Sequence, residues 1–196
     1  MLNDQNIAGT TLAITEDDRK RLTQYLTETR ERLLGTARGL SPQQLNHKPG
    51  PDRWSVAEVL EHLTVTESRL LPRIEAVLQG SPDPAKASAW EGREEALLQS
   101  VISRSPRVQA PDPIQPTGRW GHEELFRQME AARGRTSEFA ATTNAPLRGF
   151  FQTHPVLGEL DCYQWLLITG AHWERHRAQI EEVKADVNFP RRVGAA

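Results

Sequence analysis

Segments rich in proline and glycine divide the chain into four stretches with helical periodicity, and the segment between the second and third stretches constrains the fold most. It covers residues 80 to about 120 and includes prolines at positions 82, 84, 106, 111, 113 and 116. Because proline breaks a helix interior, only a short amphipathic insert around Glu94–Ile102 is expected to be helical there. About forty residues exceed what a tight antiparallel connection needs but suffice for a crossover along a bundle. Helices two and three are therefore expected to run parallel.

Capping signals place the starts of these helices. Thr15 precedes three acidic residues, Ser55 and Glu58 form a capping-box pattern, and Asp161 has Gln164 three residues later. The expected helices cover residues 15–37, 55–80, 121–143 and 161–185. Pro72 predicts a kink or early fraying in the second helix. No strand-like alternation of useful length is visible, so the fold class is all-α.

The length of 196 residues favours one domain. We expect a flexible leader over residues 1–14, a single helical domain over 15–186 and a fraying tail over 187–196. The net charge of −2 with no basic cluster argues against a nucleic-acid surface. The N-terminus lacks a basic region followed by an apolar run, and nowhere do 18 apolar residues follow one another. We therefore expect a cytoplasmic protein without membrane contact.

The last helix, DCYQWLLITGAHWERHRAQIEEV, carries His172 and His176 four residues apart. This spacing puts both imidazoles on one face, inside the apolar stripe that the helix must bury. Burying two polar rings is costly unless their nitrogens are satisfied. Two interpretations stay open: core histidines bonded to carbonyls or water, or a pair that binds one metal ion together with a third ligand from elsewhere.

His62 and the residues between the two histidines of the last helix also bear on that site. His62 borders the apolar stripe of the second helix, as a ligand at a cleft wall or an ordinary boundary histidine would. The run HWERH differs from the zincin motif HExxH, because Trp173 replaces the catalytic glutamate and Glu174 points away from the histidine face. A zincin-type peptidase is therefore disfavoured.

Cys162 is the only cysteine, so no disulfide within one chain can form, and it is expected to be a packed bystander.

Three motifs in order carry a resemblance to a known family. They are RWSVAEVLEHL from Arg53 to Leu63, HPxxG from His154 to Gly158, and HxxxHxxQI from His172 to Ile180. Together they resemble the DinB-like superfamily over nearly the whole chain. The resemblance implies a four-helix bundle in up-down-down-up order with a long crossover between helices two and three. It also implies one divalent metal held by His62, His172 and His176.

The resemblance further suggests chemistry. Its members include thiol-dependent S-transferases, maleylpyruvate isomerases and proteins regarded as metal-dependent hydrolases, so we expect a small-molecule substrate. The cofactor would be zinc or nickel, or iron, with a low-molecular-weight thiol as a cosubstrate. Glu58 and Gln179 are candidates to orient the ligands, and His154 is expected to be structural or to line the mouth. The alternative is a non-catalytic metal-binding stress-response or scaffold protein. The resemblance also suggests homodimers, for which Trp90 or Trp120 could serve.

Overall fold

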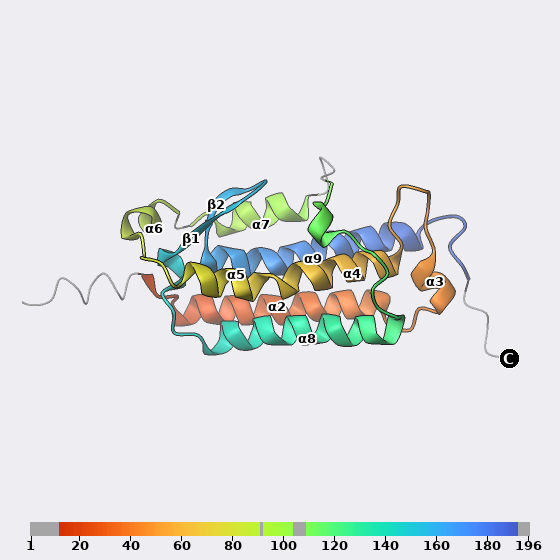
Figure 1. Cartoon of the computed structure of the whole chain (residues 1–196), viewed down its shortest axis with the longest axis horizontal. Helices are drawn as coiled ribbons and strands as arrows, with labels where there is room; N and C mark the ends of the chain where they lie inside the picture. The colour runs from red at the N-terminus through yellow and green to blue at the C-terminus, as the bar shows by residue number, and fades with distance from the viewer. Residues whose placement is uncertain (1–11, 91, 104–108, 192–196) are drawn as a thin grey trace, which may run out of the picture.

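The computed structural model describes residues 12–90, 92–103 and 109–191, and its framework is a four-helix bundle (Figure 1). The bundle helices are α2 (Glu16–Ala37), α4 (Val56–Ser68) continued by α5 (Leu70–Val77), α8 (His122–Thr142) and α9 (Cys162–Lys184). In Figure 1, α2 and α9 run in one direction, whereas α4 and α8 run in the other. Both α2 and α4 pack against α8 and α9. The predicted all-α bundle in up-down-down-up order is thus confirmed.

Three of the predicted capping signals form complete capping boxes. The hydroxyl of Thr15 accepts from the amide of Asp18, and that of Ser55 accepts from Glu58. The carboxylate of Asp161 accepts from the Gln164 amide at 2.6 Å. The helix after Ser55 breaks at Arg69, between α4 and α5. Pro72 explains the break, because it has no N–H to continue the helical hydrogen bonds.

The crossover between α5 and α8 contains more helix than the sequence predicts. Helix α7 (Glu94–Ile102) matches the expected insert and packs along α9. A short helix, α6 (Pro84–Trp90), and a 3₁₀ turn, η1 (Asp112–Ile114), were not expected. Pro84 is tolerated because it occupies the first position of α6, where a missing N–H costs nothing. The proline count alone therefore understated the structure of this segment.

A two-stranded antiparallel sheet precedes α9, a small addition to the all-α bundle that the sequence pattern did not reveal. Strand β1 (Phe151–His154) pairs with β2 (Gly158–Asp161), with His154 opposite Gly158. Gly158 adopts a φ of 79°, which suits glycine at the end of a three-residue hairpin loop. Strands of four residues are too short to show a clear alternation in the sequence.

The packed region extends past the expected boundaries at both ends. Leu12 and Ile14 are buried, although residues up to 14 were expected to be loose. Near the other end, Phe189 packs edge-on against His47, which follows the short helix α3 (Pro42–Asn46). The carbonyl of Pro190 accepts from Gln44 at 2.9 Å. Residues 1–11 and 192–196 of the expected leader and tail lie outside the described residues.

Two apolar clusters form the core. One gathers the hairpin, α5, α7 and the first half of α9 with the start of α2, and includes Leu22, Ile74 and Leu166. The other lies toward the opposite end of the bundle and includes Leu33, Leu63 and Ile180. Trp120 is half-buried against this second cluster, and the side chain of Trp90 lies outside the described residues.

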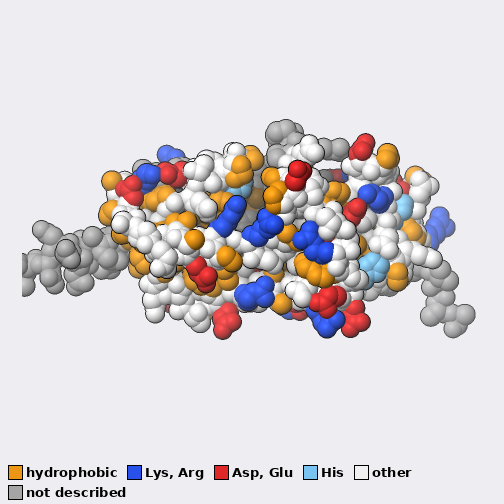
Figure 2. Space-filling model, in the orientation of Figure 1, with side chains coloured by type: hydrophobic (Ala, Val, Ile, Leu, Met, Phe, Trp, Pro, Cys, Tyr) orange, Lys and Arg blue, Asp and Glu red, His pale blue; other side chains and the backbone are white. Residues whose placement is uncertain are grey.

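The charged surface and the helix lengths bear on the expectations about nucleic acid and membrane contact. Figure 2 shows acidic and basic side chains interspersed over the displayed face. Among the described residues, no helix combines the length and apolar character needed to cross a membrane.

Candidate metal centre

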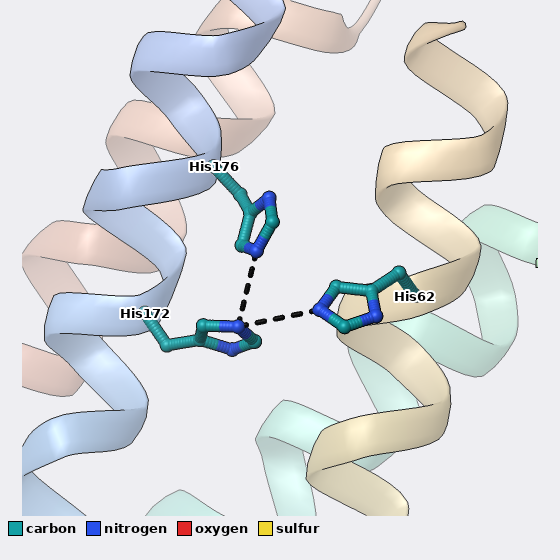
Figure 3. Close-up of side chains that lie close together, drawn as sticks. All are labelled: His62, His172 and His176. Atoms are coloured by element: carbon teal, nitrogen blue, oxygen red, sulfur yellow. Dashed lines mark hydrogen bonds between the residues drawn. The ribbon is translucent and has the colours of Figure 1, made fainter. Parts of the chain in front are cut away.

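Three histidine rings converge between α4 and α9 (Figure 3). His62 extends from α4, and His172 and His176 extend from successive turns of α9. The Nε2 atom of His172 lies 3.3 Å from Nε2 of His62 and 3.1 Å from Nε2 of His176. One ring nitrogen from each residue lies within 4.8 Å of the other two. The structure therefore brings together the three histidines that the sequence singled out.

Two of the rings are oriented through their other nitrogen. Nδ1 of His62 donates to the backbone carbonyl of Ile114 at 2.9 Å, and Nδ1 of His176 donates to Oε1 of Gln179 at 2.8 Å. Carbonyl oxygens only accept, so in a neutral ring the proton resides on Nδ1 and the lone pair on Nε2. Both lone pairs therefore face the shared space, as metal-binding histidines require.

Electrostatics favour neutral rings. Burial lowers the pKa of His62, although its bond to the Ile114 carbonyl opposes that shift. Burial also lowers the pKa of His172 and His176 well below the ordinary value, and the neighbouring rings disfavour a further positive charge. Neutral imidazole is the form that binds metal ions, so no proton must be displaced at neutral pH.

Nitrogen lone pairs facing one another at 3.1–3.3 Å repel unless a cation or a proton lies between them. No acidic side chain hydrogen-bonds to any of these three rings among the described residues. A divalent cation would satisfy all three at once, and zinc–imidazole bonds of about 2.0–2.1 Å place two ligands of a tetrahedral ion roughly 3.3 Å apart. The donor set therefore fits such an ion.

The outer contacts differ in part from those expected. Gln179 contacts His176, as its position on the helix predicts. Glu58 does not reach His62: it accepts from the Ser55 amide at 2.7 Å and from Lys48 at 3.0 Å. Its place at the third position of α4 commits it to the capping box. The Ile114 carbonyl orients His62 instead.

His154 lies at the hairpin turn. Its Nδ1 accepts from the backbone amides of Val156 and Leu157, both at 3.2 Å, and its ring packs against Trp165. Burial is the main cause that lowers its pKa, and the charge of Arg73 adds to the shift. These contacts give His154 a structural place in the hairpin.

Sequence reasoning missed two contacts at the centre. The ring of Trp54 lies 5.0 Å from that of His62 and stacks at 6.4 Å from that of His176. Trp54 precedes the Ser55 cap, outside any helical periodicity, so no pattern places it near the histidines. Ile114 acts through its backbone carbonyl, and a side-chain motif does not reveal such a contact.

Two residues were expected to take no part in the site. Glu174 bonds to Arg32 of α2 at 2.7 Å and to Arg177 at 3.1 Å, so it faces away from the histidines as predicted. Cys162 is buried, and burial together with the Asp161 charge raises its pKa to about 12. A thiol with that pKa is a poor nucleophile at neutral pH.

Comparison with known proteins places the chain in a family. The model of the DinB superfamily matches residues 25–180, which include all three histidines. The chain belongs to the DinB superfamily. The resemblance carried by the three sequence motifs is thereby confirmed.

Two relatives from Bacillus subtilis are similar to this DinB-superfamily chain. The uncharacterized protein YuaE of strain 168 is 26% identical over 161 residues, covering 82% of this chain and 95% of YuaE. The structure of YfiT aligns with a TM-score of 0.57 at 16% identity, covering 90% of this chain and 91% of YfiT. YfiT is described as a probable metal-dependent hydrolase with an unusual four-helix bundle topology. At this identity the likeness shows a shared fold.

Proposed function

We propose that this protein is a metal-dependent enzyme in which His62, His172 and His176 hold one divalent ion. The observation that carries the proposal is the convergence of three ring nitrogens within 4.8 Å, from two helices, with two rings locked in the required tautomer. Membership of the DinB superfamily and the description of YfiT as a probable metal-dependent hydrolase agree with it.

Zinc or nickel is our preferred ion, with iron as a further candidate, because imidazole nitrogen suits all three. Three protein ligands on one side leave coordination positions open for a small molecule, as in catalytic rather than structural zinc sites. A divalent ion bound there supplies Lewis acidity, which lowers the pKa of a coordinated water or thiol. The indole ring of Trp54 packs beside His62 and His176 and gives the site an aromatic wall on that side.

The chain's own residues determine what kind of activation is available. No carboxylate contacts the three rings among the described residues, and Glu58 and Glu174 are bonded elsewhere. Glu58 and Glu174 are therefore not placed to act as general bases beside the histidines. A water would give a hydrolase, and a low-molecular-weight thiol would give an S-transferase.

The second candidate is a metal-binding stress-response or scaffold protein that catalyses no reaction. The same observation favours it, because a general base beside the metal is a common part of hydrolytic sites.

Turnover assays separate the two candidates. The zinc and nickel forms are incubated with a chromogenic ester, and separately with a small thiol and an alkylating electrophile. Conversion that is lost in His172→Ala and kept in His122→Ala supports the enzyme. His122 serves as the control because it bonds to Asn46 at the start of α8 and not to the three histidines. Stoichiometric metal without conversion of either substrate supports the non-catalytic candidate.

A further inference from the structure

Glu61 precedes His62 on α4, and its carboxylate binds the crossover rather than the histidine site. The side chain is only 4% exposed, yet it is charged and accepts four hydrogen bonds. The donors belong to three consecutive residues: Thr117 (amide 2.8 Å, hydroxyl 3.3 Å), Gly118 (amide 2.8 Å) and Arg119 (Nε 2.7 Å). Oε1 accepts three of these bonds and Oε2 accepts the fourth, from the Gly118 amide, so both oxygens of the carboxylate are engaged with the crossover.

The backbone of the crossover is shaped for this contact. Gly118 has a φ of 70°, in the region that favours glycine. Successive amides around such a residue can turn toward one anion, as in the backbone nests that bind anions elsewhere. The amides of Thr117 and Gly118 both reach the Glu61 carboxylate in this way.

The same segment carries the carbonyl that orients His62. Ile114 belongs to η1. The backbone amide of Ile114 donates to the Pro111 carbonyl at 3.0 Å and so closes this turn. Arg119 links back to the carbonyl of Gln115 at 3.2 Å, and Gln115 bonds to Ala110 at 2.6 Å. These bonds tie residues 110–119 into one unit. The hydrogen bonds between Glu61 and Thr117–Arg119 therefore also fix the position of the Ile114 carbonyl.

We propose that Glu61 is a positioning residue for the metal centre: by clamping Thr117, Gly118 and Arg119 it holds the Ile114 carbonyl against Nδ1 of His62. This inference rests on the proposed metal site and adds a residue that contacts no ligand ring. It explains why an acidic side chain is buried beside the histidines without pointing at them. Its effect passes through a backbone carbonyl contributed by a segment more than 50 residues away.

Glu61→Gln tests the clamp, with Glu58→Gln as the matched control. Glutamine keeps the size of the side chain but replaces one acceptor oxygen with an NH₂ donor, which cannot pair with a crossover amide. Glu58 lies one turn earlier on the same helix and bonds only to Ser55 and Lys48 in the contacts described above. Both changes remove one negative charge from α4, and only Glu61→Gln removes an acceptor from the crossover and weakens its ion pair with Arg119.

The first readout is the dissociation constant of Zn²⁺ measured by competition with a chromophoric chelator. Loss of an outer contact to a metal ligand typically weakens binding about 10- to 100-fold. We expect a weakening in that range for Glu61→Gln and a change of less than about threefold for Glu58→Gln. Arg119→Gln removes one of the four donors to Glu61, at a partly exposed side chain, and is expected to give a smaller loss of zinc affinity. This variant replaces Glu61→Gln as the test if Glu61→Gln does not fold.

The second readout is the tautomer of His62 in the metal-free protein, from ¹⁵N chemical shifts of the ring. The wild type should hold the proton on Nδ1, and Glu61→Gln should give a mixture. Unchanged zinc affinity and an unchanged tautomer in Glu61→Gln would overturn the positioning role while leaving the metal site intact. If the wild type binds no zinc, the proposed function fails, and the tautomer of His62 then decides the role of Glu61 by itself.

Discussion

Glu67 of α4 and Arg133 of α8 form an ion pair in the middle of the bundle, with both side chains at most 1% exposed. The guanidinium Nε lies 2.8 Å from one carboxylate oxygen, and Nη2 donates to the other at 3.0 Å. Arg133 also donates to the Leu26 carbonyl and lies over the Trp173 ring, 3.8 Å from its centroid. The pair stands between the two apolar clusters and links all four bundle helices.

Breaking this pair should be costly. Glu67→Ala leaves a buried guanidinium without its counter-charge, and we expect a loss of about 3–5 kcal/mol in the free energy of unfolding measured with urea. Glu130→Ala is the control, because Glu130 pairs with Arg30 and Arg38 at partly exposed side chains and should cost less than about 1 kcal/mol. In the double variant Glu67→Leu/Arg133→Met most of the loss should be recovered. A double variant as unstable as Glu67→Ala would contradict this account.

Comparison of this ion pair with the other elements shows which features the sequence could predict and which it could not. The capping signals at Ser55 and Asp161, the long proline-rich crossover and the spacing of His172 and His176 are local patterns. Each predicted its place in the bundle, although the crossover contains more helix than expected. Arg133 looks like any charged residue of an amphipathic helix, and only the packing of three other helices around it reveals its burial. Trp54 and Ile114 were missed for the same reason, since they depend on contacts between distant segments. The hairpin strands were missed because four residues are too few to show an alternating pattern.

Metal binding should stabilise the fold. A ligand that binds only the native state adds about 2.7 kcal/mol at a concentration 100 times its dissociation constant. We therefore expect Zn²⁺ or Ni²⁺ to raise the melting temperature of chelator-treated protein, and His172→Ala to abolish that rise. His122→Ala should keep it. The measurement is thermal unfolding by circular dichroism, and an equal shift in all three proteins would indicate binding elsewhere.

The metal-free protein should lose stability in mild acid. The pKa of His62, His172 and His176 is lower in the folded chain than the ordinary value of about 6.5, mainly because of burial. Below about pH 6.5 the unfolded chain binds more protons than the folded chain. The contribution of these groups to the free energy of unfolding is therefore fully present above about pH 6.5 and is lost as the pH drops toward the pKa values of the folded chain. Each group contributes a slope of up to about 1.4 kcal/mol per pH unit. Urea unfolding between pH 7.5 and 5 should show a shallower slope in His172→Ala than in the wild type.

Gln179 should set the affinity of the centre through His176. Gln179→Leu removes the acceptor of the Nδ1 proton, which should weaken zinc binding about 10- to 100-fold. Gln179→Glu keeps an acceptor oxygen and should restore most of the affinity. Competition with a chelator measures both, and equal affinity in Gln179→Leu and the wild type would show that packing alone holds the His176 ring.

Two glycines in bundle helices should respond to alanine in opposite ways. A Cβ added at Gly170 of α9 would lie 2.7 Å from the ring carbons Cδ1 and Cε1 of Tyr25, where α2 and α9 approach closely. We expect Gly170→Ala to cost about 1–3 kcal/mol, because overpacking forces the ring or the helices to move. A Cβ at Gly134 of α8 would meet nothing within 4 Å, so Gly134→Ala should stabilise the protein by about 0.5–1 kcal/mol. Adding Tyr25→Ala to Gly170→Ala tests the cause: if the clash with the ring is responsible, the cost of Gly170→Ala in urea unfolding should shrink when Tyr25 is absent, and an undiminished cost would place the strain in the backbone instead.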